Sequence, residues 1–270
     1  PDLVLILSSS CTETSLDEKI LRMPLQANWQ QQLNEIFEQL QGADWIYLLH
    51  AGDRLIEPAL LVMAERIVSF ANVRCLYSDE GALREGDSVN PAFKPDFNLD
   101  LLRSFPYIGR ALAFDREHLL AVGGFNESFG ELAPHDALWR LVEAHGTQAV
   151  EHISEILVET WLGLIEWLAL PQVVEQNRLM VHAHLERLGV AHEMRQGSME
   201  LLNRVDYLHA DRPLVSIIIS SKDQLPAMQR CIESVLEKTA YGEYELLLVD
   251  NGSDQPETLT WLAAMAQLGS

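Results

Sequence analysis

Residues that could bind a ligand directly follow several predicted strands. His50 and Asp53 come after the apolar run 45–49, and Asp250 follows the apolar run 245–249. In open α/β sheets, ligands bind beyond the carboxyl ends of the strands. Carboxylate oxygens suit Mg²⁺, and an imidazole suits Mn²⁺ better. These positions are therefore candidates for metal or ligand contacts.

Each of these residues also has a purely structural interpretation. Asp53 lies ahead of Pro58, where it could cap the helix that follows. Asp250 precedes Asn251 and Gly252, a combination common in turns. The residue types alone leave both interpretations open.

The elements that would position these residues alternate along the chain. Residues 2–7, 45–49 and 73–77 have the apolar character of buried strands, while 28–40 and 58–70 have helical spacing. Strands that alternate with helices indicate an α/β fold with a mostly parallel sheet and helices on both faces.

The same pattern starts again near Pro213. A buried strand is predicted over 214–219, a helix over 225–237 and a further strand over 245–249. The segments 213–221 and 245–253 also resemble 2–10, which suggests tandem copies of one fold. We therefore predict a first domain over 1–170, a helix and connector over 171–213, and the start of a second domain over 214–270.

Composition narrows the class of protein. The 270 residues include 19 Lys and Arg against 40 Asp and Glu, so the net charge is −21. This balance argues against binding to nucleic acid or to an anionic membrane surface. Three widely spaced cysteines indicate reduced thiols in a cytoplasmic protein, with membrane association only through a longer protein. The start at Pro1 suggests that the chain is part of something longer.

Several motifs of the chain together form a recognisable pattern. The segments VSIIISSKDQ, CIESVLEKT and YELLLVDNGSD resemble the opening of a family 2 glycosyltransferase of the nucleotide-binding, Rossmann-like GT-A fold. YLLHAGDRLIEPALL, LYSDEG, PAFKPDFNLDLL, YIGRALAF, REHLLAVGGF and HDALWRLVEAHG resemble its later part. The order of these motifs implies a shortened first copy, followed by the opening of a second.

The resemblance implies transfer of a sugar from a nucleotide-diphosphate sugar to a glycan hydroxyl, with Mn²⁺ or Mg²⁺, in cell-surface polysaccharide synthesis. A divalent ion stabilises the pyrophosphate leaving group, and a carboxylate base deprotonates the acceptor. The roles that the resemblance implies are nucleotide binding for Asp250, Ser220, Asp223, Asp79 and Lys94, metal binding for Asp53 and His50, catalysis for Asp136, and an acceptor-side turn at Gly123, Gly124 and Phe125.

The first copy departs from the family pattern at three functional positions. Residues 7–10 (LSSS) replace the nucleoside carboxylate, the metal motif 50–53 keeps one carboxylate, and Pro134 occupies the usual position of the base. We therefore expect a first domain that keeps the fold and has lost or weakened the chemistry. The alternative is a non-catalytic module that binds glycan or scaffolds a polysaccharide-assembly enzyme. An unrelated nucleotide-binding protein is disfavoured, because the chain has no glycine-rich phosphate loop.

Two further features remain. Only one strand is predicted before the helix 28–40, so a central strand of the first sheet is missing. The first copy is either simply truncated, or 214–219 fills the gap within one chain or by exchange between two. His182, His184 and His192 suggest a metal cluster, but positions 182 and 184 point about 200° apart on a helix. We therefore predict that these are surface histidines.

Overall fold

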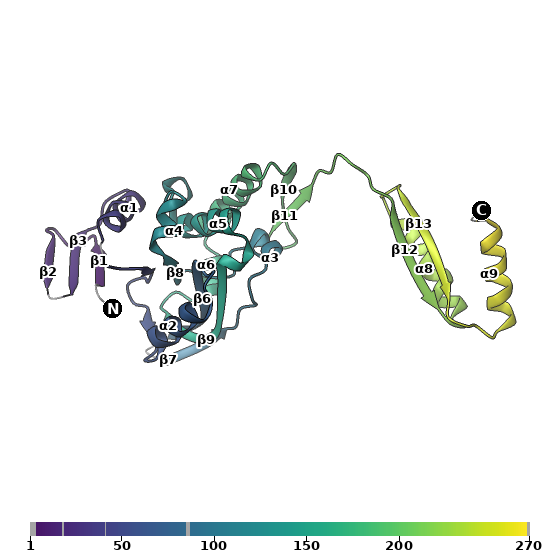
Figure 1. Ribbon diagram of the computed structural model, residues 1–270, viewed down its shortest axis with the longest axis horizontal. Helices are drawn as coiled ribbons and strands as arrows, with labels where there is room; N and C mark the ends of the chain where they lie inside the picture. The colour runs from purple at the N-terminus through teal and green to yellow at the C-terminus, as the bar shows by residue number, and fades with distance from the viewer. Residues whose placement is uncertain (1–3, 18, 41, 85–86, 269–270) are drawn as a thin grey trace. The chain divides into compact units, whose positions relative to one another are not determined.

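The computed structural model describes residues 4–17, 19–40, 42–84 and 87–268. They form two compact units, 1–208 and 209–270, which are considered separately (Figure 1). No helix among these residues has the length and apolarity to cross a membrane.

The first unit begins with a small sheet of strand order β1-β3-β2. Its strands are β1 (Val4–Ser8), β2 (Ser15–Asp17) and β3 (Ile20–Pro24), and the helix α1 (Trp29–Gln39) follows. β1 is parallel to β3, and β2 is antiparallel to it. The prediction of a single strand before this helix was wrong. β2 and β3 are too short, and too often interrupted by polar residues, to show a strand period.

The larger sheet of the first unit has the order β4-β8-β6-β9-β5, with β7 beside β6. Its strands are β4 (Trp45–Tyr47), β5 (Arg54–Leu55), β6 (Cys75–Arg84), β7 (Asp87–Ala92), β8 (Leu112–Asp115) and β9 (Val150–Thr160). The predicted α/β class is confirmed. The sheet is mixed, however, because β6 and β9 are parallel while the other pairings of its described strands are antiparallel.

Helices pack on both faces of this sheet. Successive side chains of a strand point to opposite faces, so a single strand contributes residues to the cores on both faces. Cys75 and Tyr77 of β6 join the larger hydrophobic core with α5 (Ala133–His145), whereas Leu76 joins a smaller core with α2 (Ala59–Ser69). The helices of this unit are α2 (Ala59–Ser69), α3 (Leu99–Ser104), α4 (Arg116–Ala121), α5 (Ala133–His145), α6 (Leu164–Leu168) and α7 (Pro171–Arg187), with 3₁₀ turns at Glu127–Leu132 and Thr147–Ala149.

After α7, the strands β10 (His192–Gln196) and β11 (Asn203–Tyr207) form an antiparallel pair that ends the first unit. The predicted connector is thus partly strand.

The second unit contains β12 (Val215–Ser221), α8 (Leu225–Lys238), β13 (Tyr244–Asp250) and α9 (Pro256–Leu268). β12 and β13 are parallel, and α8 lies against β12 (Figure 1). Met228 and Ile232 are the buried residues of α8. A sheet of two strands leaves apolar side chains in solvent, and Ile218 is 67% exposed. Exchange of the segment 214–219 between chains stays a prediction.

Candidate active site and its carboxylates

Asp53, a predicted metal ligand, lies in a tight turn, and both of its carboxylate oxygens accept backbone N–H groups. One carboxylate oxygen accepts the His50 backbone N–H at 3.0 Å, and the other accepts the Trp161 N–H at 3.1 Å. Arg110 lies 3.7 Å away, and the Asp53 side chain is 1% exposed. Burial and Arg110 lower the pKa of His50. A buried carboxylate beside a guanidinium does not fit Mg²⁺ or Mn²⁺, which need several accessible oxygens.

Asp79 and Lys94, predicted to contact the donor, lie side by side in a buried network. The Lys94 ammonium donates to Glu80 at 2.8 Å and to the Ile108 carbonyl at 2.9 Å. Asp79 accepts the Lys94 backbone N–H at 2.8 Å and bonds His152 at 2.9 Å. Burial lowers the pKa of Lys94, against the opposing effect of Glu80. These groups are therefore satisfied inside the protein, with little surface left for a phosphate.

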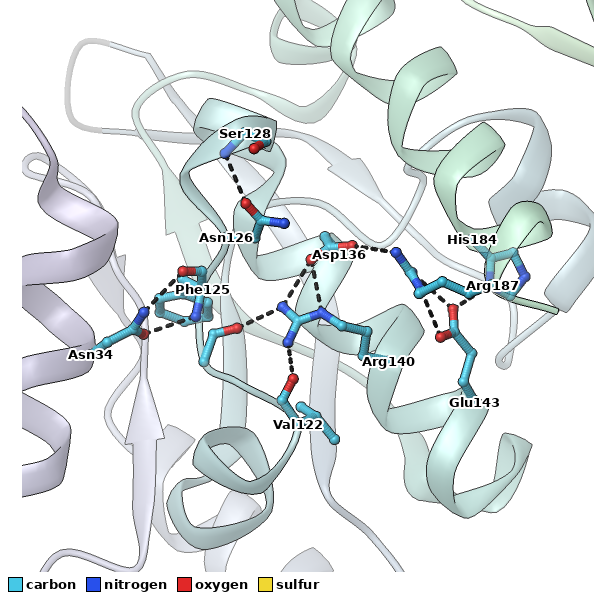
Figure 2. A network of polar contacts seen from close by, with 11 residues as sticks. Asn34, Val122, Phe125, Asn126, Ser128, Asp136, Arg140, Glu143, His184 and Arg187 are labelled. Atoms are coloured by element: carbon cyan, nitrogen blue, oxygen red, sulfur yellow. Dashed lines mark hydrogen bonds and ion pairs between the residues drawn. The ribbon is translucent and has the colours of Figure 1, made fainter.

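Asp136, the predicted base, is fully buried near the start of α5 and is held by two arginines (Figure 2). Its carboxylate binds Arg140 at 2.8–2.9 Å and Arg187 of α7 at 3.2 Å. Arg140 also donates to the Val122 and Gly124 carbonyls. Asp136 thus links α5 to α7 and to the turn after α4. Both of its oxygens are occupied.

The ion-pair network continues along α5. Glu143 accepts two bonds of 2.8 Å from Arg187 and one of 2.6 Å from His184 (Figure 2). Burial raises the pKa of Glu143, but the bonds from His184 and Arg187 outweigh this effect and hold the pKa below its usual value. His184 is buried and stacks on Trp139 at 3.9 Å between ring centroids, so its prediction as a surface histidine was wrong.

The turn Gly123, Gly124 and Phe125 is built around Asn34 of α1. Asn34 accepts the Phe125 N–H at 2.8 Å and donates to the Phe125 carbonyl at 2.9 Å (Figure 2). Phe125 packs in the core against Phe37 and Phe114. Gly123 and Gly124 have φ of 95° and 64°, a region that favours glycine. The turn is therefore a structural anchor, whatever else it binds.

Replacing Gly124 by alanine is expected to destabilise the first unit by about 2 kcal/mol, because the left-handed backbone is strained. In addition, the new Cβ would lie 2.3 Å from the Asn34 Oδ1. Urea unfolding measures the change. Gly189→Ala is the matched control, since Gly189 has φ of 67° and open space around the Cβ position. An equal loss in both variants would show that the Asn34 contact contributes nothing.

A cavity of about 420 Å³ opens beside this turn. Its lining is rich in amides and includes one guanidinium: Asn28, Gln31, Asn34, Val122, Gly123, Phe125, Asn126, Glu127 and Arg140. Planar amides and a guanidinium suit the hydroxyl groups of a sugar, because they donate and accept hydrogen bonds in fixed directions.

The second unit carries another cavity, of about 370 Å³, at the carboxyl ends of its parallel strands. It is lined by Ile219, Ser220, Ser221, Lys222, Gln224, Ala227, Met228, Cys231 and Asn251. The Ser221 hydroxyl is buried and has no hydrogen-bond partner among the described residues. A buried polar atom of this kind is available to a ligand.

Asp250 and Asp223 shape the loops beside this cavity. Asp250 accepts the Ser253 backbone N–H at 3.1 Å and its hydroxyl at 2.5 Å. Asp223 has φ of 51° and accepts the backbone N–H groups of Asp254 and Gln255 at 3.0 and 2.9 Å. These backbone bonds lower the pKa of Asp223. The predicted nucleotide-binding residues Ser220, Asp223 and Asp250 thus lie at one end of β12 and β13.

The sequence prediction missed the arginines that bind the carboxylates. Arg140 follows Asp136 by four residues, the spacing at which helical side chains meet, so that pair had a readable signal. Arg110 and Arg187 are distant in sequence from their partners and had none.

Comparison with known proteins identifies the class. Residues 216–270 match the family model Glycosyl transferase family 2. The chain is 34% identical over 234 residues to the O-antigen biosynthesis protein RfbC of Myxococcus xanthus, covering 85% of this chain and 18% of that protein. It is 33% identical over 235 residues to the uncharacterized protein y4gI of Sinorhizobium fredii (strain NBRC 101917 / NGR234), covering 84% of this chain and 26% of that protein.

Among solved structures, glucosyl-3-phosphoglycerate synthase from Mycobacterium tuberculosis has 13% identity and a TM-score of 0.42, over 72% of this chain and 73% of that one. The resemblance of the motifs to family 2 glycosyltransferases is confirmed, and the match to the family model lies in residues 216–270. It spans about a fifth to a quarter of the length of the curated relatives that it matches.

Proposed function

We propose that the chain serves in the transfer of a sugar from a nucleotide-diphosphate sugar to a glycan hydroxyl during cell-surface polysaccharide synthesis. The match of residues 216–270 to the family model and the similarity of the chain to an O-antigen biosynthesis protein support this proposal. We further propose that the first unit does not perform the chemistry. The donor nucleotide then binds at the second unit, and the chain by itself is weakly active or inactive.

The proposal that the first unit does not perform the chemistry rests on its carboxylates, which are bound by groups inside the protein. A general base needs an accessible oxygen within hydrogen-bond reach of the acceptor hydroxyl. Asp53, Asp79 and Asp136 are each bound by internal donors, and none of them lines the cavity beside Gly123 or the cavity of the second unit. Among the described residues of the first unit, these three carboxylates therefore do not suit the metal that the resemblance implies, Mn²⁺ or Mg²⁺.

The second unit offers the groups that a nucleotide needs. Lys222 supplies a positive charge for a phosphate, and the Ser221 hydroxyl and Asn251 supply hydrogen bonds in the same cavity. Asp250 stands at the carboxyl end of β13. Ser253 donates to its carboxylate, but the residue is exposed, unlike the buried carboxylates of the first unit, so it can still accept the hydroxyl groups of a ribose.

The test is calorimetric titration of the chain with UDP, with and without Mn²⁺. We expect saturable binding that Asp250→Asn weakens at least tenfold, because the carboxylate acceptor is lost. Asp254→Asn is the control, since that side chain is exposed in the same loop. Binding that survives Asp250→Asn and disappears in Asp53→Asn would overturn the proposal.

The second candidate function is glycan binding by a non-catalytic first unit. The amide-rich cavity beside Gly123 favours it. Saturation-transfer NMR with oligosaccharides tests it, with Gln31→Ala as the variant of a cavity residue. Gln39→Ala, at an exposed position of the same helix, is the control. Signals of equal strength in both variants would count against the site.

A further inference from the structure

The end of α7 and the start of β10 bring three metal-binding side chains together. His182 and Glu186 are four residues apart on α7 and so share one face of the helix. His192 is the first residue of β10. One ligand atom from each of the three lies within 4.8 Å of the others. None of the three belongs to the network around Asp136 or to either cavity described above.

The hydrogen bonds of His192 determine which nitrogen of its ring carries the hydrogen. Its Nδ1 lies 2.7 Å from the Val190 carbonyl, which only accepts, so Nδ1 carries a hydrogen. In the neutral ring, the lone pair is then on Nε2, 2.8 Å from the Nδ1 of His182. A backbone carbonyl that orients the second ring nitrogen is the usual arrangement around metal-bound histidines.

The backbone between the two elements is well defined. The Gly189 N–H donates to the Glu186 carbonyl at 3.0 Å, and the Val190 N–H donates to the Leu185 carbonyl at 3.0 Å. Gly189 has φ of 67°, which allows the chain to reverse directly after α7. Pairing of β10 with β11 then fixes His192 opposite Tyr207. The three ligands are therefore placed by ordered backbone on both sides.

We propose that His182, Glu186 and His192 bind one Zn²⁺ ion, which joins α7 to β10. Two imidazoles and a carboxylate are a common protein ligand set for zinc, with water in the fourth position. Zinc bonds of about 2.1 Å in a tetrahedron place ligand atoms roughly 3.4 Å apart. The two histidine nitrogens need only a small separation from their 2.8 Å contact to reach this geometry.

The site departs from the expectation of unrelated surface histidines for a geometric reason. His184 does point away from His182, as the helical spacing predicted, and is buried against Trp139. The missing partners were Glu186, one turn further along the helix, and His192 beyond it. The site does not depend on the proposed sugar transfer.

The experiment is a zinc titration of the whole chain in a Cys11→Ser and Cys231→Ser background, because the described residues include these two thiols outside the core. We expect one ion per chain and a rise in melting temperature on zinc addition. His182→Ala, Glu186→Gln and His192→Ala should each weaken binding at least tenfold and remove most of that rise. Bound Co²⁺ should give the visible absorption of a tetrahedral site without thiolate charge-transfer bands.

The matched controls are Glu175→Gln, an exposed carboxylate earlier on α7, and His209→Ala. Both should keep the affinity of the parent. His182 and Glu186 are exposed, so their variants are expected to fold, and circular dichroism checks this. Absence of zinc binding, or equal binding by the three site variants and the controls, would overturn the proposal.

Discussion

Asp136→Ala is expected to destabilise the first unit by about 3–5 kcal/mol, the range for removing one partner of a buried ion pair. Asp136 has no exposed surface and binds both Arg140 and Arg187. Its removal leaves two guanidinium groups without their shared acceptor and removes one of the ion pairs between α5 and α7, while Glu143 still binds Arg187. Urea unfolding followed by circular dichroism gives the free energy.

Two variants separate this structural role from a catalytic one. Asp136→Asn keeps the shape and one acceptor oxygen, so it should lose less than the alanine variant. Asp100→Ala removes an ion pair whose carboxylate side chain is 83% exposed, and should change stability by at most about 1 kcal/mol. If Asp136→Ala were as stable as the parent while sugar transfer disappeared, Asp136 would be a catalytic residue and our assignment would fail.

Strongly periodic segments were predictable from the sequence. The helix expected over 58–70 is α2 (Ala59–Ser69), and the helix expected over 225–237 is α8 (Leu225–Lys238). The strand expected over 245–249 is β13 (Tyr244–Asp250). In each case the spacing of the apolar residues determines the type of element, so the local pattern and the observed structure agree.

Strand direction was not predictable in the same way. β8 has the apolar character of a buried strand, yet it lies antiparallel to both β4 and β6. Burial on both faces produces the same apolar run in either direction, because the pattern reports contact with helices and not the course of the chain. The mixed sheet follows from connections that hydrophobicity does not encode.

The candidate site, too, was predictable from the sequence only in part. The loss of carboxylates at positions 7–10 and at Pro134 was visible in the sequence. The internal partners of the carboxylates that remain were not, since Trp161 and Arg187 reach Asp53 and Asp136 from more than 50 residues away. Sequence motifs identify which groups are present. Only the fold shows whether those groups are free to react.

His135 is expected to make the stability of the first unit fall as the pH drops below about 6.5. The ring is 1% exposed, stacks on Trp167, and has no hydrogen-bond partner among the described residues. Burial, with a smaller effect of Lys94, lowers the pKa of His135 to about 3. The unfolded chain takes up a proton near pH 6.5. The stability is therefore complete above that pH and is lost between about 6.5 and 3, by about 1.4 kcal/mol per pH unit.

Urea unfolding at pH 7 and pH 5 of the parent and His135→Leu measures this contribution. The parent should lose about 2 kcal/mol more than His135→Leu between the two pH values, because the leucine variant binds no proton there in either state. Carboxylates that titrate in the same range affect both proteins alike and cancel in the difference. Gln39→Leu, which changes an exposed residue without a titrating group, should follow the parent. Equal losses in the parent and His135→Leu would mean that water reaches the ring and that His135 binds a proton in the folded protein as well.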